Sequence, residues 1–366
     1  MEAPCACAGP ICNGHAVPVN TTAMKISQIA LRLGQSLLRI TGALAIVLGL
    51  LLVAILAVTT MPGSSHRGAL PAATAEQQAL AQQLQRHVAV IAAQEHNAQH
   101  PAALEAVATY LESELVSYGY QVRRDEFKAR GGAVRNLEVT VPSQSAPGRR
   151  LVVIGAHYDS AHETPGANDN ATGTAAVLAL AKSLKHLGAT AQADVMFVLY
   201  TNEEPPFFKT PQMGSQVHAQ ALQARGAPVV AMLSLETMGY FSNAEGSQKY
   251  PWPLNQFYPT QGDFIAFVAT TPDLGLARRV VRSFRSHAAF PSEGIAAPRF
   301  IPGVDYSDHA AYIDAGYPAL MVTDTAPYRY PHYHTREDTS DKVDYDRLAR
   351  VVQGLEGVVR DLAHRP

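Results

Sequence analysis

The stretch LVVIGAH at residues 151–157 decides the fold class, because it is apolar along nearly its whole length and shows no polar alternation. Three similar runs follow it: DVMFVLYT at 194–201, VVAMLSLE at 229–236 and YPALMVTD at 317–324. Continuous apolar runs of this length are typical of strands that are buried on both faces of a sheet. We therefore expect these four runs to form the centre of one sheet.

The remaining segments predict the layers around that sheet. Helical spacing of apolar residues occurs at residues 76–94, 101–118, 170–186, 213–225, 272–287 and 345–362. Two segments with alternating polarity, at 120–129 and 133–142, predict an antiparallel pair of strands. The order of elements predicts an α/β fold with a mixed, largely parallel central sheet covered by helices on both faces.

The composition excludes some function classes. The chain has 366 residues, of which 47% are hydrophobic and 16% charged, and its net charge is -2. This balance is typical of a globular protein and not of a disordered one. Since no long basic block occurs, we expect no nucleic-acid partner.

An apolar, uncharged run at residues 41–60 is long enough for a helix to cross a membrane. Lys25, Arg32 and Arg39 precede it, which favours a cytoplasmic N-terminus. We therefore predict a cytoplasmic tail at 1–40, a transmembrane signal anchor at 41–61, a linker at 62–75 and one domain at 76–366. That domain would lie outside the cytoplasm, on a single-pass protein of the inner membrane. A cleaved signal peptide is the alternative.

Side chains that bind metals gather where the predicted strands end. In open α/β sheets, sites form at the carboxyl ends of strands. The candidates are His157, Asp159, Asp169, Glu203, Glu204, Glu236 and His334. Taken singly, each has a structural alternative, such as a helix cap for Asp169. Taken together, imidazole nitrogens and carboxylate oxygens form a zinc ligand set, in which a carboxylate can bridge two cations.

Five motifs in order carry a resemblance to a known family. GAHYDS, GANDNATG, NEE, SDHAAY and YHTREDT lie between residues 151 and 339. In these motifs the chain resembles the co-catalytic zinc aminopeptidases, whose relatives include glutamate carboxypeptidase, glutaminyl cyclase and the transferrin receptor. The resemblance implies a zinc exopeptidase fold for residues 76–366 and two Zn²⁺ ions per chain.

The resemblance also assigns ligands to the two ions. Asp169 is similar to the carboxylate that bridges both metals. Glu204 and His334 would complete one site, and His157 and Glu236 the other. The family usually has aspartate at the position of Glu236, in a pattern like NLDMIG where this chain has SLETMGY. The extra methylene puts the occupancy of the second site in question.

Further roles follow from the same resemblance. Glu203 is similar to the general base that takes a proton from the attacking water. Tyr333 resembles a tyrosine that stabilises the oxyanion, and Asp159 a partner that fixes the ring of His157. The family also tends to have a cis peptide bond at the position of Asp169–Asn170.

Other residues near the motifs have supporting or open roles. Asp308, His309 and Asp338 match family positions that we interpret as supports for the ligands. The segment 205–208, PPFF, and Trp252 would either line a substrate pocket or, for the phenylalanines, pack in the core. Their sequence pattern does not decide between these roles.

The predicted function is that of an aminopeptidase that hydrolyses N-terminal residues from peptides with a free N-terminus. A glutaminyl cyclase-like aminoacyltransferase and a metal-free receptor-like domain are the alternatives. Specificity and oligomeric state stay open.

The adjacent Glu203 and Glu204 set one geometric condition. Successive side chains on a strand point to opposite faces, so both can reach one site only if the strand ends before them. Pro205 and Pro206 favour such an end.

Overall fold

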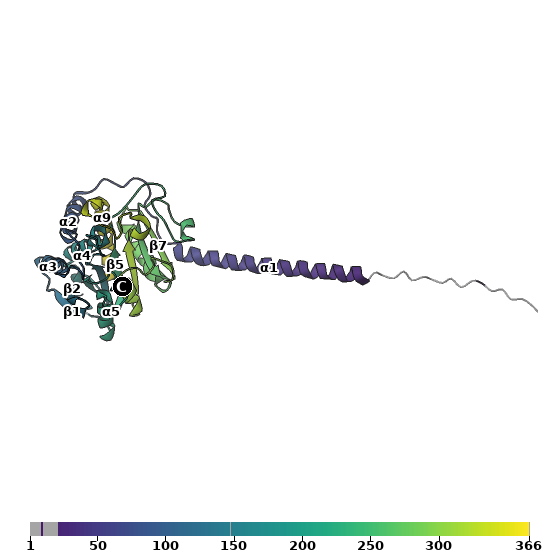
Figure 1. Ribbon diagram of the computed structural model, residues 1–366, viewed down its shortest axis with the longest axis horizontal. Coiled ribbons are helices and arrows are strands. Elements are labelled where there is room, and N and C mark those ends of the chain that lie inside the picture. Colours follow the sequence, from purple (N-terminus) through teal and green to yellow (C-terminus); the bar gives the residue numbers. More distant parts are fainter. Residues whose placement is uncertain (1–8, 10–20, 147, 366) are drawn as a thin grey trace, which may run out of the picture. The chain divides into compact units, whose positions relative to one another are not determined.

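The computed structural model describes Gly9, residues 21–146 and residues 148–365 (Figure 1). The chain divides into two compact units between Leu56 and Ala57. Helix α1, Thr21–Thr59, runs through most of the first unit, and its part Gln28–Thr59 is long and apolar enough to cross a membrane. This criterion rests on length and composition, and a signal sequence meets it too. Most of the predicted tail before residue 21 lies outside the described residues.

The second unit is built on one eight-stranded sheet. Its strands are β1 (Arg123–Ala129), β2 (Gly132–Val141), β3 (Leu151–His157), β4 (Asp194–Tyr200), β5 (Val229–Glu236), β6 (Ile265–Thr270), β7 (Ser292–Ala297) and β8 (Ala319–Thr323). Its helices are α2 (Ala75–Ile91), α3 (Pro101–Ser117), α4 (Thr172–Ser183), α5 (Gly214–Ala224), α6 (Leu274–His287), α7 (His309–Asp314), α8 (Ala326–Arg329) and α9 (Tyr345–His364).

The strand order is β1-β2-β4-β3-β5-β8-β6-β7. The central strands β4, β3, β5 and β8 are parallel, while β1, β2 and β4 are joined by antiparallel pairing. Strand β6 runs antiparallel to β8 and parallel to the edge strand β7. The mixed, largely parallel sheet of the predicted fold is therefore confirmed. The sequence analysis missed β6 and β7, which extend the sheet beyond the predicted strands.

One face of the sheet carries the main hydrophobic core. Along β3, Val152 and Ile154 point into this core, whereas Leu151 and Val153 point to the opposite face, as strand geometry requires. Helices α2, α4, α6 and α9 cover the core, and α2 and α9 lie side by side (Figure 1). Each of them begins and ends within a few residues of its predicted bounds.

The opposite face is covered in two different ways. Over the central strands, α5 and α7 pack on a second cluster that includes Met196 and Tyr312. Over β6, β7 and β8, loop residues such as Tyr250 and Ile301 pack against a third cluster around Phe264. Loops can leave more space than a helix does, and this part of the sheet adjoins a cavity described below.

The first residues of the second unit are tied to its surface. Met61 is buried in the main core. The Arg285 guanidinium donates hydrogen bonds to the carbonyl oxygens of Met61, Pro62 and Gly63 at 3.3, 3.2 and 2.9 Å. The predicted linker at 62–75 therefore begins in contact with helix α6.

The contact between α4 and β5 gives a test of the fold. A Cβ atom on Gly173 would lie 2.3 Å from the carbonyl oxygen of Leu235 and 2.4 Å from Oδ1 of Asn170. We expect Gly173→Ala to lower the free energy of unfolding by about 1–3 kcal/mol, because a backbone oxygen must move. Chemical denaturation followed by circular dichroism measures the change.

The matched control is Gly275→Ala, near the start of helix α6. A Cβ there would meet nothing within 4 Å, so the free energy of unfolding should change by less than about 0.5 kcal/mol. Equal effects of the two substitutions would contradict the packing argument.

Candidate metal centre and active site

The carboxyl ends of three central strands bring the predicted ligands together. His157 and Glu236 are the last residues of β3 and β5, and Glu203 and Glu204 follow the end of β4. Asp169 lies in a π-helical turn, Ala167–Ala171, just before α4. All five are buried, with exposed fractions of 8% or less, and His334 joins them from a loop after α8. The structure thus places every predicted ligand in one cluster.

Asp169 lies between the two histidines. Its Oδ1 is 3.4 Å from Nε2 of His157, and its Oδ2 is 3.0 Å from Nε2 of His334. Glu236 Oε2 lies 3.3 Å from the same His157 nitrogen, and Glu204 Oε1 lies 3.4 Å from that of His334. The side chains therefore form two groups that share Asp169, in the same division that the resemblance implies.

The cluster has the features of a cation site. His157, Asp169 and Glu204 each offer a ligand atom, and these atoms lie within 4.8 Å of one another. Glu204 Oε1 is buried and makes no hydrogen bond of acceptable geometry with any described residue. A buried carboxylate oxygen without a donor is costly, and a metal ion would compensate it. Nitrogen and oxygen ligands of this kind fit zinc.

Burial and the neighbouring negative charges shift the pKa values of the residues in the cluster. Burial, followed by the charge of Asp169, raises the pKa of Glu204 to about 7. Burial also raises the pKa of Glu236 to about 7. Burial alone would lower the pKa of His334, but its contacts with the Asp169 and Glu204 carboxylates raise it to about 11. The cluster therefore holds protons that a metal ion would displace on binding.

The chain leaves the strand conformation between β4 and the two glutamates, as their shared site requires. Strand β4 ends at Tyr200, and Asn202 has a left-handed φ of 59°, a conformation that asparagine tolerates better than most residues. The expectation that the strand ends before Glu203 and Glu204 is confirmed. Both side chains can then reach the same site.

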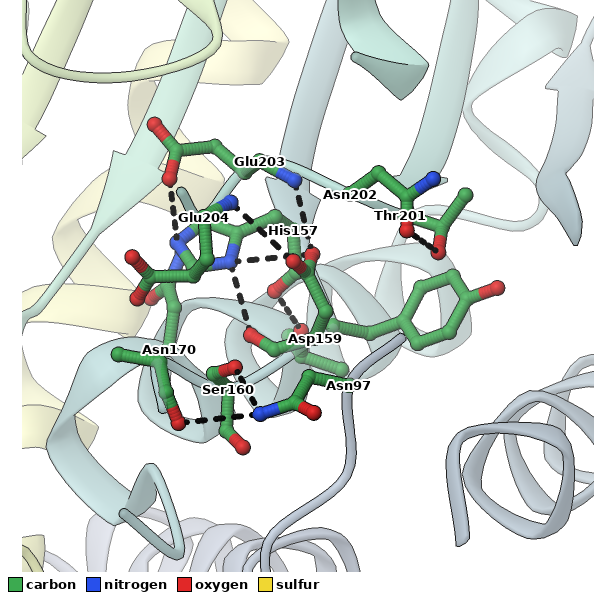
Figure 2. A network of polar contacts seen from close by, with 12 residues as sticks. Asn97, His157, Asp159, Ser160, Asn170, Thr201, Asn202, Glu203 and Glu204 are labelled. Carbon is green, nitrogen blue, oxygen red and sulfur yellow. Dashed lines mark hydrogen bonds and ion pairs between the residues drawn. The ribbon is translucent and has the colours of Figure 1, made fainter. Parts of the chain in front are cut away.

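The Asp159 carboxylate holds this turn in place. It accepts hydrogen bonds from the backbone N–H groups of Glu203 at 3.0 Å and Glu204 at 3.1 Å (Figure 2). The ring of His157 donates from Nδ1 to the main-chain carbonyl of Asp159 at 3.0 Å, while the carboxylate is 3.6 Å away. Asp159 therefore orients the ring mainly through its backbone, and its side chain positions the glutamates. The sequence analysis missed this second task.

Asp338 acts in the same way on the loop that carries Asp169. Its carboxylate accepts hydrogen bonds from the N–H groups of Asn168 at 2.8 Å and Asp169 at 3.1 Å. The Asp169–Asn170 peptide bond is cis, as the resemblance implies. Asp338 thus supports the proposed bridging carboxylate through its main chain.

Asp308 and His309 are fully buried beside the first turn of α7. Burial raises the pKa of Asp308 to about 7. Burial lowers the pKa of His309 to about 4, so the ring is neutral near pH 7 and donates to the carbonyl of Val304 at 2.9 Å. The ring of His309 thus bonds to the loop at Val304 and to no predicted ligand in the described part of the chain, so its role as a support for the ligands stays a prediction.

Tyr333 stands at the edge of the cluster. Its ring stacks on that of His334, with centroids 3.9 Å apart. Burial, reinforced by the charge of Asp169, raises the pKa of the Tyr333 phenol, so the hydroxyl keeps its proton near neutral pH. The side chain can therefore donate a hydrogen bond to a bound substrate.

A cavity of about 100 Å³ adjoins Tyr333 and Glu236. Its lining comes from the loops that follow β5 and β7 and from strands β6, β7 and β8. Neither residues 205–208 nor Trp252 line it, and Trp252 is 85% exposed. The expectation that Trp252 lines the pocket is wrong for this cavity, and Phe207 is buried in the protein instead.

Comparisons with known proteins agree with the geometry. Residues 136–359 match the family described as Peptidase family M28. The chain is 40% identical over 261 residues to "Uncharacterized protein YfbL" of Escherichia coli (strain K12), covering 69% of this chain and 78% of that protein. It is 26% identical to "Leucine aminopeptidase 1" of Fusarium vanettenii, covering 61% of this chain and 54% of that protein.

Among solved structures, LapB from Legionella pneumophila has a similar fold. The TM-score is 0.61 at 18% sequence identity, and the match covers 84% of this chain and 79% of that chain. At this identity the likeness concerns the fold alone.

The two hydrogen bonds of the Asp159 side chain give a test of the site's construction. Asp159→Ala would leave two buried N–H groups without an acceptor, which costs about 1–3 kcal/mol each. We expect the free energy of unfolding to fall by about 2–4 kcal/mol, as measured by denaturation in guanidinium.

Asp159→Asn is the matched control, because it keeps one acceptor oxygen and should lose less stability. If repulsion among the carboxylates determined the change in stability instead, both substitutions would raise the free energy of unfolding. An increase would contradict the proposed hydrogen bonds from Glu203 and Glu204 to Asp159.

Proposed function

Since this chain belongs to peptidase family M28 and is therefore a metallo-exopeptidase of the hydrolase class, we propose that it is a zinc-dependent aminopeptidase. It would remove N-terminal residues from peptides with a free N-terminus. The observation that carries the proposal is the position of Asp169 between His157 and His334, with Glu203 beside them.

The proposed ligands form two sites for Zn²⁺. Asp169 would be shared, Glu204 and His334 would complete one site, and His157 and Glu236 the other. The contact of Glu236 with His157 at 3.3 Å supports its place in the second site despite its extra methylene. Zinc in such sites lowers the pKa of a coordinated water to about 7 and polarises a substrate carbonyl.

Glu203 is the proposed general base. Its carboxylate is 7% exposed and lies 3.9 Å from Nε2 of His157, close to the ligands. Burial, together with the charges of Glu204 and Glu236, raises the pKa of Glu203, which favours proton acceptance. The side chain would take a proton from the attacking water and deliver it to the leaving amine.

Tyr333 is the proposed oxyanion donor. Its protonated hydroxyl would donate a hydrogen bond to the oxygen that becomes negative in the transition state. Stacking on His334 restricts the ring, so this donor is held in position before the substrate binds.

The N-terminal segment completes the proposal. The apolar part of α1 would act as a signal anchor at residues 41–61, with residues 1–40 in the cytoplasm. The linker at 62–75 and the peptidase domain at 76–366 would lie outside the inner membrane. The peptide substrates would accordingly be periplasmic or extracellular.

The role of Glu203 is tested by Glu203→Gln. We expect kcat on aminoacyl reporters to fall by about 10²–10⁴-fold, because a general base contributes about that much. Zinc content, measured by atomic emission, should stay at the wild-type value since Glu203 is not a proposed ligand.

Near-normal turnover in this variant would refute the role of Glu203. Cyclisation of a glutaminyl peptide with release of ammonia, in the absence of peptide-bond cleavage, would instead favour the aminoacyltransferase alternative.

Metal removal gives a second test. Treatment with a chelator should abolish activity and lower the Tm, because the buried carboxylates lose their counter-charge, and added Zn²⁺ should restore both. The wild-type protein should hold two zinc ions per chain and Glu236→Ala one. A count of one in the wild type would contradict the two-ion proposal.

A further inference from the structure

The cavity beside Tyr333 has a floor formed by aligned residues of four strands. Glu236 on β5 pairs with Thr323 on β8, Thr323 pairs with Ala266 on β6, and Ala266 pairs with Glu293 on β7. Paired residues of neighbouring strands point to the same face of a sheet, and all four line the cavity. The row therefore leads from a proposed metal ligand at one end to a second carboxylate at the other.

The space between these two carboxylates is apolar. A second row, Met321, Val268 and Ile295, lies beside the first and lines the same cavity. Tyr250 and Tyr258 stack on each other in the wall, with ring centroids 5.6 Å apart. A side chain that entered from the metal centre would pass apolar groups before it met Glu293.

The Glu293 carboxylate has no direct partner. It is partly buried and makes no hydrogen bond or ion pair with any residue that the structure describes. The positive charges that act on it are those of Arg285 and Arg67. Arg285 is already engaged by Ser292 and by the carbonyl groups of Met61, Pro62 and Gly63.

We propose that this cavity receives the side chain of the substrate's N-terminal residue and that Glu293 selects lysine or arginine there. The proposal rests on the proposed aminopeptidase function and names its substrate class. The apolar floor would contact the methylene groups of such a side chain, and Glu293 would pair with its charged end.

The cost of desolvating Glu293 determines whether a charged or an apolar side chain binds better in the cavity. A long apolar side chain would remove water from the carboxylate and give it no replacement, which is unfavourable. An ammonium or guanidinium group would supply the missing donor, and the apolar walls would reduce screening by solvent. The same cavity therefore favours a cation over an uncharged group of equal length.

The dimensions fit a long side chain. Three strand spacings of about 4.8 Å separate the backbones of Glu236 and Glu293 by about 14 Å. An extended lysine side chain spans about 6 Å, and Glu293 lines the same cavity from the far strand. Alanine or valine would leave the distal part of the cavity to water.

The test compares lysyl and norleucyl reporters, because norleucine has the apolar stem of lysine without its charge. With the full-length protein in detergent, we expect kcat/KM for lysyl and arginyl reporters to exceed that for norleucyl by about tenfold. Glu293→Gln should remove most of this ratio, because it lowers kcat/KM for the lysyl reporter and raises it for the norleucyl reporter, whose side chain no longer desolvates a charge. Glu293→Asp, which keeps the charge, should retain part of the ratio.

The control is Glu126→Gln, an exposed carboxylate on β1 at the opposite edge of the sheet. It removes the same charge and should leave the ratio unchanged. Cleavage of the norleucyl reporter with no preference for lysine, or a preference that survives Glu293→Gln, would overturn the role of Glu293 alone. A lack of turnover on every reporter would overturn the aminopeptidase function and this proposal with it.

Discussion

The concentration of buried negative charge at the carboxyl ends of β3, β4 and β5 is the constraint on which the rest of the site depends. Carboxylates that lie this close repel one another and lose hydration, so each needs a compensating group. Asp159 and Asp338 are compensated by backbone N–H groups, and Asp169 by two histidine rings. Glu204 keeps an oxygen without a donor. This uneven compensation is the feature of the cluster that a metal ion fits.

The main chain adopts unusual conformations to create this arrangement. Asn202, Thr237 and His334 all have left-handed φ values. Asn202 precedes Glu203, Thr237 follows Glu236, and His334 is itself a member of the cluster. For a β-branched residue such as Thr237 this conformation is costly, and such costs are tolerated where the surrounding contacts fix the backbone. Here Asn170 Oδ1 accepts the N–H of Thr237 at 3.0 Å. The loops of the site are thus held by one another's side chains.

The sequence predicts those parts of the structure that depend on local pattern and on family motifs. Long apolar runs identify the central strands, and ordered motifs identify His157, Asp169 and the other residues of the buried cluster. Strand β7 is harder to predict, because SEGIAA combines a charge, a glycine and small residues, and its pairing with β6 is a non-local contact. The contacts of the Asp159 carboxylate with a turn more than forty residues away have no signal in sequence spacing either. Nothing in the sequence distinguishes Glu293 from any other residue of an edge strand. Only the strand pairing shows that it lies in the same row as Glu236.

The buried cluster and the cavity are built from different segments of the chain. Residues of the buried cluster occur up to Glu236 and again at His334, whereas most of the cavity lining comes from the intervening segment, residues 237–328. Within this segment, β6 and β7 extend the sheet beyond β8, while β8 itself pairs with β5 near the centre of the sheet. Substitutions on β6 and β7 can reshape the cavity while the buried His157, Asp169 and Glu204 side chains stay unaltered. The outer strands β6 and β7 are therefore the part of the sheet in which evolution, or a protein engineer, can vary the cavity with least effect on the cluster at the ends of β3, β4 and β5.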